Sequence, residues 1–396
     1  MQDDTTAMKS FKDLVLNNKE RPYFGMNPVD DQWDEITIKE GYMVYFEGNT
    51  IKKTISYYDD PYVRYQESDI EIHTRDRQFV LPQTAKGKEK KLNFTSVSSI
   101  NPSGCTFSMN LAFEWGERKY TSEVRARNNR NCLELPITGY ENLESFEQYK
   151  GWLKDYISTC PSDYFEKVEK MRNEKHKTVK YFNGDVFRFE LDREHYGFGL
   201  IIGQIREMKK DGLFPPEHAL DSTMCVPLLI RLYLVKTKDK KMLLSDICSH
   251  QLSRTFIMAD GLVIWGRYEI IGNKMLEEND VDFPIQIGES LELKKRYFRF
   301  CWGPGMIVIH NHGRVPDAID NNRFLRHAVY GGVDERLLEC PGHDTQKEDK
   351  TIPKEAFKFF NLSPGITYDD FNLKYGGMTR AQYADYANKR SRTKGK

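Results

Sequence analysis

Acidic side chains and a histidine gather in one short stretch of the sequence. Glu190, Asp192, Glu194 and His195 follow one another closely. Such groups transfer protons in general acid–base catalysis when they line a pocket beside a reacting atom. On a strand, Glu190 and Asp192 would share one face because side chains alternate. The stretch could therefore form a catalytic site, a surface that contacts a partner, or a water-exposed turn.

Apolar residues on both sides of this stretch predict a β-hairpin. Val186, Phe187 and Phe189 precede it, and an apolar run at residues 198–205 follows it. Short apolar runs separated by a polar link are typical of a hairpin. The tip of the hairpin would then lie at residues 192–195, where water is abundant. A water-exposed turn is therefore favoured over a partner-contact surface, and a catalytic site is the least favoured. If a partner does bind here, the expected contact residues are Asp192, Glu194, His195 and Tyr196.

A second candidate for chemistry is the sequence His310, Asn311 and His312. Two histidines spaced by two can share a strand face and bind zinc. No acidic residue or cysteine stands at a usual short spacing from them, so a polar strand end leading into Gly313 is favoured. The sequence also contains neither a phosphate-binding P-loop nor a dinucleotide-binding glycine motif. We therefore expect no metal, no cofactor and no enzymatic activity.

Cysteine usage and hydropathy indicate the cellular compartment. The sequence has seven cysteines, none of them in a C-x-x-C pair. An odd number of widely spaced cysteines is typical of free thiols in a reducing cytosol. The first residues are polar and acidic, unlike a signal peptide, and no apolar run is long enough to span a bilayer. These features predict a cytoplasmic protein without membrane association.

The overall charge disfavours a general nucleic-acid binder. Lysine plus arginine and aspartate plus glutamate each number 59, which gives a formal net charge of zero. General nucleic-acid binders carry a basic surface. Local support for such a role comes from Arg125, Arg127 and Arg130 and from the basic end KRSRTKGK at residues 389–396. Nucleic-acid binding stays open as an alternative.

The pattern along the chain predicts a β-rich α+β protein with two domains. Residues 1–177 read as a β-rich domain that is closed by a helical hairpin. Residues 178–345 read as about six short strands divided by turns, which favours a small curled antiparallel sheet or barrel. Within them, residues 255–258 and 262–265 flank Asp260 and Gly261, a signal for a β-hairpin. Residues 346–396 are expected to form a helical extension with a basic tail.

The second domain resembles the immunity protein 26 family of bacterial polymorphic toxin systems. The resemblance covers about residues 179–339 and rests on the order and spacing of several short motifs. They are GDVF at 184–187, YGFG at 196–199, Trp265, YEIIG at 268–272, DFP at 282–284 and YFRFCWGP at 297–304. The first domain has no counterpart in that family.

The resemblance implies a binding protein. Such a protein holds a cognate toxin domain and blocks its active site or its substrate groove. Charge complementarity would speed the association, and aromatic and arginine anchors would supply most of the binding energy. The partner-contact residues at the hairpin tip would then face a protein toxin. Trp265 and Trp302 are expected to belong to the core.

Overall fold

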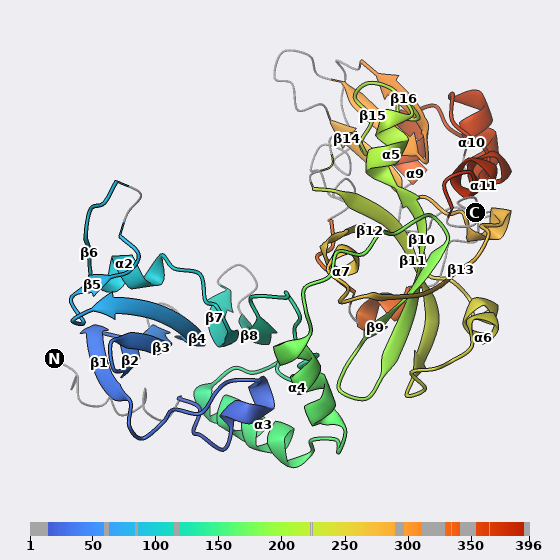
Figure 1. The fold of residues 1–396 in the computed structure, drawn as a ribbon. Coiled ribbons are helices and arrows are strands. Elements are labelled where there is room, and N and C mark those ends of the chain that lie inside the picture. The colour runs from blue at the N-terminus through green and yellow to red at the C-terminus, as the bar shows by residue number, and fades with distance from the viewer. Residues whose placement is uncertain are drawn as a thin grey trace. The chain divides into compact units, whose positions relative to one another are not determined.

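The chain forms two compact units, Met1–Lys177 and Thr178–Lys396. They are seen in a computed structural model of the whole chain (Figure 1). The structure describes residues 15–58, 63–83, 86–114, 119–221, 223, 225–289, 297–310, 329–333, 335–340, 354–363 and 365–391. Below, they are called unit 1 and unit 2.

Unit 1 is built on an antiparallel sheet in which β1 to β6 pair in chain order, while β7 pairs with both β4 and β8. The strands are β1 (Asp34–Lys39), β2 (Tyr42–Glu47), β3 (Thr50–Tyr58), β4 (Val63–Arg75), β5 (Phe79–Val80), β6 (Lys90–Lys91), β7 (Cys105–Glu114) and β8 (Lys119–Asn128). Apolar side chains alternate along β4 and β7, so Tyr65, Phe107 and Met109 are buried on one face. Val44, Ile51 and other residues form a second core cluster with the short helix α2 (Phe94–Ser98).

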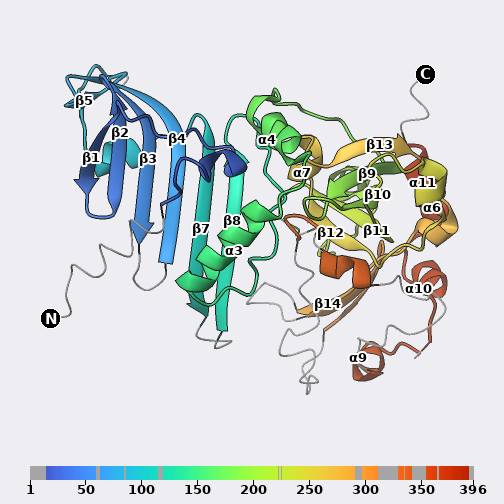
Figure 2. The same ribbon diagram turned by 90° about the horizontal axis from the view of Figure 1, so that it is seen from below.

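The predicted helical hairpin closes unit 1. Helix α3 (Phe146–Ser158) begins where the Ser145 side chain accepts a hydrogen bond from the N–H of Gln148, a common N-cap. Its apolar residues recur at helical spacing, which buries Tyr149 and Leu153. Helix α4 (Tyr164–Asn173) follows, and Figure 2 shows α3 lying across β7 and β8. An N-terminal arm with the one-turn helix η1 (Arg21–Phe24) also packs on this core.

The described residues of unit 2 form two open antiparallel sheets instead of the single curled sheet or barrel that the sequence favoured. The larger sheet has the order β12-β11-β10-β9-β13, and the smaller one has the order β14-β15-β16. Their bounds are β9 (Asp185–Glu190), β10 (Tyr196–Gln204), β11 (Pro227–Thr237), β12 (Phe256–Ala259), β13 (Glu269–Asn273), β14 (Ile285–Glu289), β15 (Phe298–Trp302) and β16 (Gly305–Ile309). The α+β class and the antiparallel pairing are confirmed.

The predicted β9–β10 hairpin forms the middle of the larger sheet. Both of its faces are covered, since Val186 and Phe198 belong to one core cluster while Phe187 and Phe189 belong to another. This explains why β10 is an almost continuous apolar run. A strand that is buried on both faces has no polar side to alternate with.

The hairpin expected around Asp260 and Gly261 is wrong. Strand β12 is followed by a single helical turn, α7 (Gly261–Ile264), that buries Val263. A tight two-residue hairpin turn needs a positive φ angle. Gly261 is absent from the glycines with positive φ, and Asp260 lies in the right-handed helical region. The chain therefore turns into a helix at this point.

The predicted C-terminal helices pack into the core of unit 2. They are α9 (Lys354–Phe359), α10 (Tyr368–Lys374) and α11 (Arg380–Asn388). The helices α5 (Ile205–Lys210) and α6 (Leu244–Ser249) and the turn η2 (Glu278–Asp280) lie between strands, and the turn η3 (Glu335–Glu339) follows β16. Tyr383 is fully buried, and its hydroxyl donates to the carbonyl of Ile202 over 3.0 Å. The basic tail beyond Ser391 lies outside the described residues. Among the described helices, none is both long and apolar enough to cross a membrane.

Candidate functional site

The tip of the β9–β10 hairpin is a turn that one carboxylate closes. Asp192 Oδ1 accepts hydrogen bonds of 2.8 Å from the backbone N–H groups of Glu194 and His195. The imidazole Nδ1 of His195 lies 2.9 Å from both carboxylate oxygens of Asp192. Aspartate often closes turns by bonding to the backbone that follows it. The side chains of Asp192 and His195 are therefore held in one arrangement.

Two lysines from the end of β11 complete this surface. Lys236 Nζ lies 3.4 Å from Asp192 Oδ2 and 2.8 Å from Glu335 Oε1, so it links the turn to η3. Lys238 Nζ donates to Glu194 Oε1 over 3.0 Å. Sequence reasoning missed both lysines, although their spacing by two places them on the same side of an extended strand.

The pKa values of the tip favour charged side chains at neutral pH. Partial burial acts to raise the pKa of Asp192, but hydrogen bonds from the N–H groups of Glu194 and His195 bring it below its usual value. The hydrogen bond from Lys238 lowers the pKa of Glu194. The hydrogen bond to Glu335 is the main cause of the raised pKa of Lys236. The tip thus presents fixed charges of both signs.

The predicted contact residues do not all reach the surface. Glu194 is exposed, and Asp192 and His195 are partly exposed, so the structure brings these three together on one turn. Tyr196 is only 6% exposed, so it is not part of this surface. The guanidinium of Arg188 lies 5.6 Å from its ring centre.

The two tryptophans differ from each other. Trp302 packs between Tyr368 and Phe371, as expected of a core residue, and its Nε1 donates to the carbonyl of Phe283 over 3.0 Å. Trp265 is 42% exposed, so the expectation that it belongs to the core is wrong. It stands at the end of α7, whose single turn is too short to bury both Val263 and the tryptophan.

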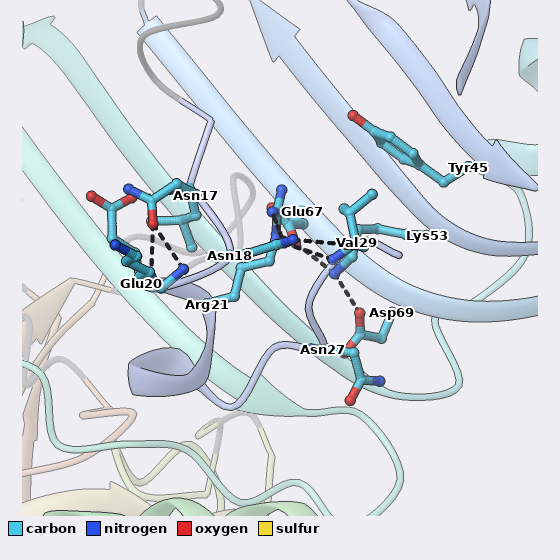
Figure 3. Close-up of polar contacts among 12 residues, drawn as sticks. Asn17, Asn18, Glu20, Arg21, Asn27, Val29, Tyr45, Lys53, Glu67 and Asp69 are labelled. Carbon is cyan, nitrogen blue, oxygen red and sulfur yellow. Dashed lines mark hydrogen bonds and ion pairs between the residues drawn. The ribbon is translucent and has the colours of Figure 1, made fainter. Parts of the chain in front are cut away.

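Unit 1 holds a buried network of charged side chains that sequence reasoning missed. Lys53 is fully buried, and its Nζ lies 2.5 Å from Glu67 Oε1 and 2.6 Å from Asp69 Oδ1. Arg21 Nε reaches the same Glu67 oxygen over 2.7 Å, and the hydroxyl of Tyr65 donates to the other oxygen. Figure 3 shows Arg21 and Lys53 meeting the carboxylates of Glu67 and Asp69 between the sheet and the N-terminal arm. A signal was present, because Glu67 and Asp69 share the strand face of the buried Tyr65.

The network is neutral as a whole because two cations face two carboxylates. Burial acts to raise the pKa of Glu67, but Lys53 and Arg21 bring it below the usual value. Burial raises the pKa of Asp69, with Lys53 opposing the shift. The second oxygen of Asp69 accepts a hydrogen bond of 2.9 Å from the N–H of Asn27, which ties the arm to the sheet.

A cavity of about 500 Å³ opens beside this network. It is lined by residues of the arm, of β3 and β4, of the turns around β7 and β8, and of the end of α4. Its charged and aromatic lining includes Trp33, Lys52, Asp69, Arg130 and Arg172. Cavities of this size bind small molecules in many proteins.

The remaining sequence candidates are not brought together. Arg125 pairs with Glu123 over 2.6 Å, whereas Arg130 lines the cavity instead. His310 ends β16, but Asn311 and His312 lie outside the described residues. Within the described part of the chain, no group of histidine, cysteine, aspartate and glutamate side chains could hold a metal ion.

Comparison with known proteins finds one similarity, and it lies in unit 2. Residues 182–297 match the family model of immunity protein 26. This span begins just before β9, contains the whole hairpin tip and ends just before β15. Unit 1 lies outside the match. No curated protein and no solved structure matches the chain.

Proposed function

We propose that unit 2 is an immunity module that binds a cognate toxin domain and neutralises it by covering its active site or substrate groove. The match of residues 182–297 to immunity protein 26 carries this proposal. The role we assign is binding and not catalysis. A cytoplasmic location belongs to the proposal, and seven cysteines that form no disulfide bond support it.

We place the toxin contact at the hairpin tip, on Asp192, Glu194 and His195. The turn and the lysines of β11 fix these side chains before a partner arrives. Fixed side chains lose little conformational freedom on binding, which favours affinity. Charges of both signs favour a partner with a complementary pattern and accelerate the encounter. Trp265 is a further candidate anchor because exposed tryptophans often dominate interface energies.

The test is capture of the partner from lysate of the source cell by the full-length chain in high salt. We expect the chain to retain one protein that is toxic when expressed alone. Glu194→Lys should weaken the complex, whereas Glu141→Lys should not, because it reverses an exposed carboxylate in unit 1.

Two outcomes would count against this proposal. One is that no protein is retained in high salt. The other is that the chain retains nucleic acid that salt removes, since binding to phosphate backbones falls steeply with salt. The second outcome would favour the nucleic-acid alternative, for which Arg125, Arg127 and Arg130 are the exposed candidates in unit 1.

A further inference from the structure

The cavity of unit 1 is assembled from segments that are distant in the chain. The arm contributes Trp33, and the sheet contributes Lys52 and Asp69. Arg130 lies just after β8, and Arg172 lies in the last turn of α4. Its volume of about 500 Å³ lies within the range of small-molecule sites. This cavity is independent of the proposed immunity module in unit 2.

The walls of the cavity are held by hydrogen bonds. Arg172 Nη2 donates to Asn27 Oδ1 over 2.8 Å, and the N–H of Asn27 donates to Asp69. The side-chain amide of Asn128 donates to the carbonyl oxygens of Met171 and Arg172, both over 2.9 Å. The arm, the sheet and the end of α4 are thereby joined around the opening. A pre-formed site of this kind needs little reorganisation to bind.

Two arginines, Arg130 and Arg172, line the cavity together with Lys52, whose ammonium pairs with Glu47 outside the lining. Lys53 offsets the charge of Asp69 at 2.6 Å. The other charged lining residues are the carboxylates Asp30 and Glu71. Arg130 is exposed and lines the cavity, so its guanidinium can be reached by a ligand.

Arg130 and Arg172 act on the same wall of the cavity. Burial and the nearby carboxylate of Asp69 raise the pKa of the Cys105 thiol to about 11, and Arg172 and Arg130 oppose this shift. Both guanidinium groups are therefore within electrostatic reach of Cys105, which also lines the cavity. The raised pKa also keeps Cys105 in its thiol form, which is a poor nucleophile. The wall is thus suited to holding an anion and not to covalent chemistry.

We propose that this cavity binds a small organic oxyanion, a carboxylate or a phosphate, which Arg130 and Arg172 hold while Trp33 covers its apolar part. Guanidinium groups form paired, charge-assisted hydrogen bonds with both kinds of anion. The carboxylates of Asp30 and Glu71 line the same cavity and disfavour a polyanion. A ligand with a single anionic group fits this balance best.

The test uses the full-length chain with inorganic phosphate and benzoate as probes, and sodium chloride at matched ionic strength as the reference. Binding is measured by calorimetry and by the shift in melting temperature. We expect saturable binding of at least one probe and a loss of about tenfold or more in affinity for Arg130→Ala. Arg130 is exposed, so this variant should fold normally. Arg125→Ala is the matched control, because Arg125 is an exposed arginine on β8 outside the cavity.

The two probes separate the two sources of the anion. Binding of phosphate alone assigns a phosphate ligand, and binding of benzoate alone assigns a carboxylate ligand. The proposal is overturned if neither probe binds saturably, if Arg130→Ala binds as the wild type does, or if Arg125→Ala loses as much affinity. Partner capture by unit 2 should be unchanged in Arg130→Ala, so the two proposals can fail separately.

Discussion

At the scale of single residues, unit 1 contains a lysine, Lys53, whose side chain is fully buried. Its removal would leave Glu67 and Asp69 buried with Arg21 as their remaining cation in the network. A buried pair that loses one partner destabilises a protein by about 3–5 kcal/mol. We therefore expect Lys53→Met to lower the free energy of unfolding by about that amount in urea denaturation.

Lys52→Met is the control for this prediction. Lys52 is the next residue, but its ammonium lies 3.6 Å from an exposed carboxylate of Glu47. Exposed ion pairs contribute about 0–1 kcal/mol, so this variant should unfold almost as the wild type does. If Lys53→Met changes stability as little as Lys52→Met, then the network does not hold the arm to the sheet.

His218 gives unit 2 a defined pH dependence. It is fully buried, its Nε2 lies 3.0 Å from the carbonyl oxygen of Gly303, and its Nδ1 accepts a hydrogen bond from the N–H of Leu220. Burial lowers the pKa of His218 from 6.5 to about 4. The folded state therefore favours the neutral imidazole. The free energy of unfolding that this preference contributes is fully present above pH 6.5 and is lost as the pH falls toward 4.

The expected loss of stability between these limits is about 3 kcal/mol, at about 1.36 kcal/mol for each pKa unit. Denaturation curves recorded across this pH range measure it. His218→Gln should be less stable at neutral pH but should lose less stability on acidification. An equal pH slope for the two proteins would show that His218 is not the group responsible.

At the scale of elements, the β9–β10 pairing depends on small residues in β10. A Cβ atom at Gly199 would lie 2.3 Å from the ring of Phe187, which stacks on Tyr268. Overpacking of a core typically costs about 1–3 kcal/mol. We expect Gly199→Ala to lower the free energy of unfolding by about this amount.

Gly151 offers the matched comparison in α3. A Cβ atom there would meet nothing within 4 Å, and alanine is favoured over glycine in helices by about 0.8–1 kcal/mol. Gly151→Ala should therefore stabilise unit 1. Urea denaturation of both variants checks the pair, and equal effects of the two substitutions would contradict the close packing of Phe187 against β10.

The elements that could be predicted from the sequence are those made by local contacts. The β9–β10 hairpin and the α3–α4 hairpin have apolar periodicity and polar turns within a short stretch. The pairing of β13 with β9 joins segments far apart in the chain, and no local pattern reveals it. The Asp260–Gly261 signal was misleading because the same dipeptide can begin a helical turn.

At the scale of the whole molecule, the C-terminal helices are part of unit 2. Tyr368 and Tyr383 are buried against the same core as Phe198 and Leu200 of β10. The sequence suggested a separate extension because helices after a β-domain show no sign of where they dock. The family match ends before these helices.

This packing predicts the effect of truncation. A chain that ends at residue 345 loses the buried Tyr368, Phe371 and Tyr383. We expect it to lose the near-ultraviolet circular dichroism of unit 2 and to aggregate, because the core around β10 would be exposed to water. A chain that ends at residue 391 keeps α11 intact and is the control. Native dichroism in the shorter chain would show that the helices are dispensable for the fold.

The candidate site was only partly visible in the sequence. The polar hairpin tip follows from local alternation, so Asp192, Glu194 and His195 could be found. Lys236 and Glu335 join that tip through tertiary contacts, and the cavity of unit 1 draws its lining from several separate segments. Such groupings depend on how strands are ordered in the sheet, and residue spacing does not reveal that order.

The most direct measurement of the central proposal is protection of growing cells. The captured partner is expressed alone, with the full-length chain, and with the Glu194→Lys variant. The account predicts arrested growth with the partner alone, full growth with the wild-type chain, and weaker protection by the variant. A partner that is harmless alone, or one that still arrests growth beside the wild-type chain, would contradict an immunity role.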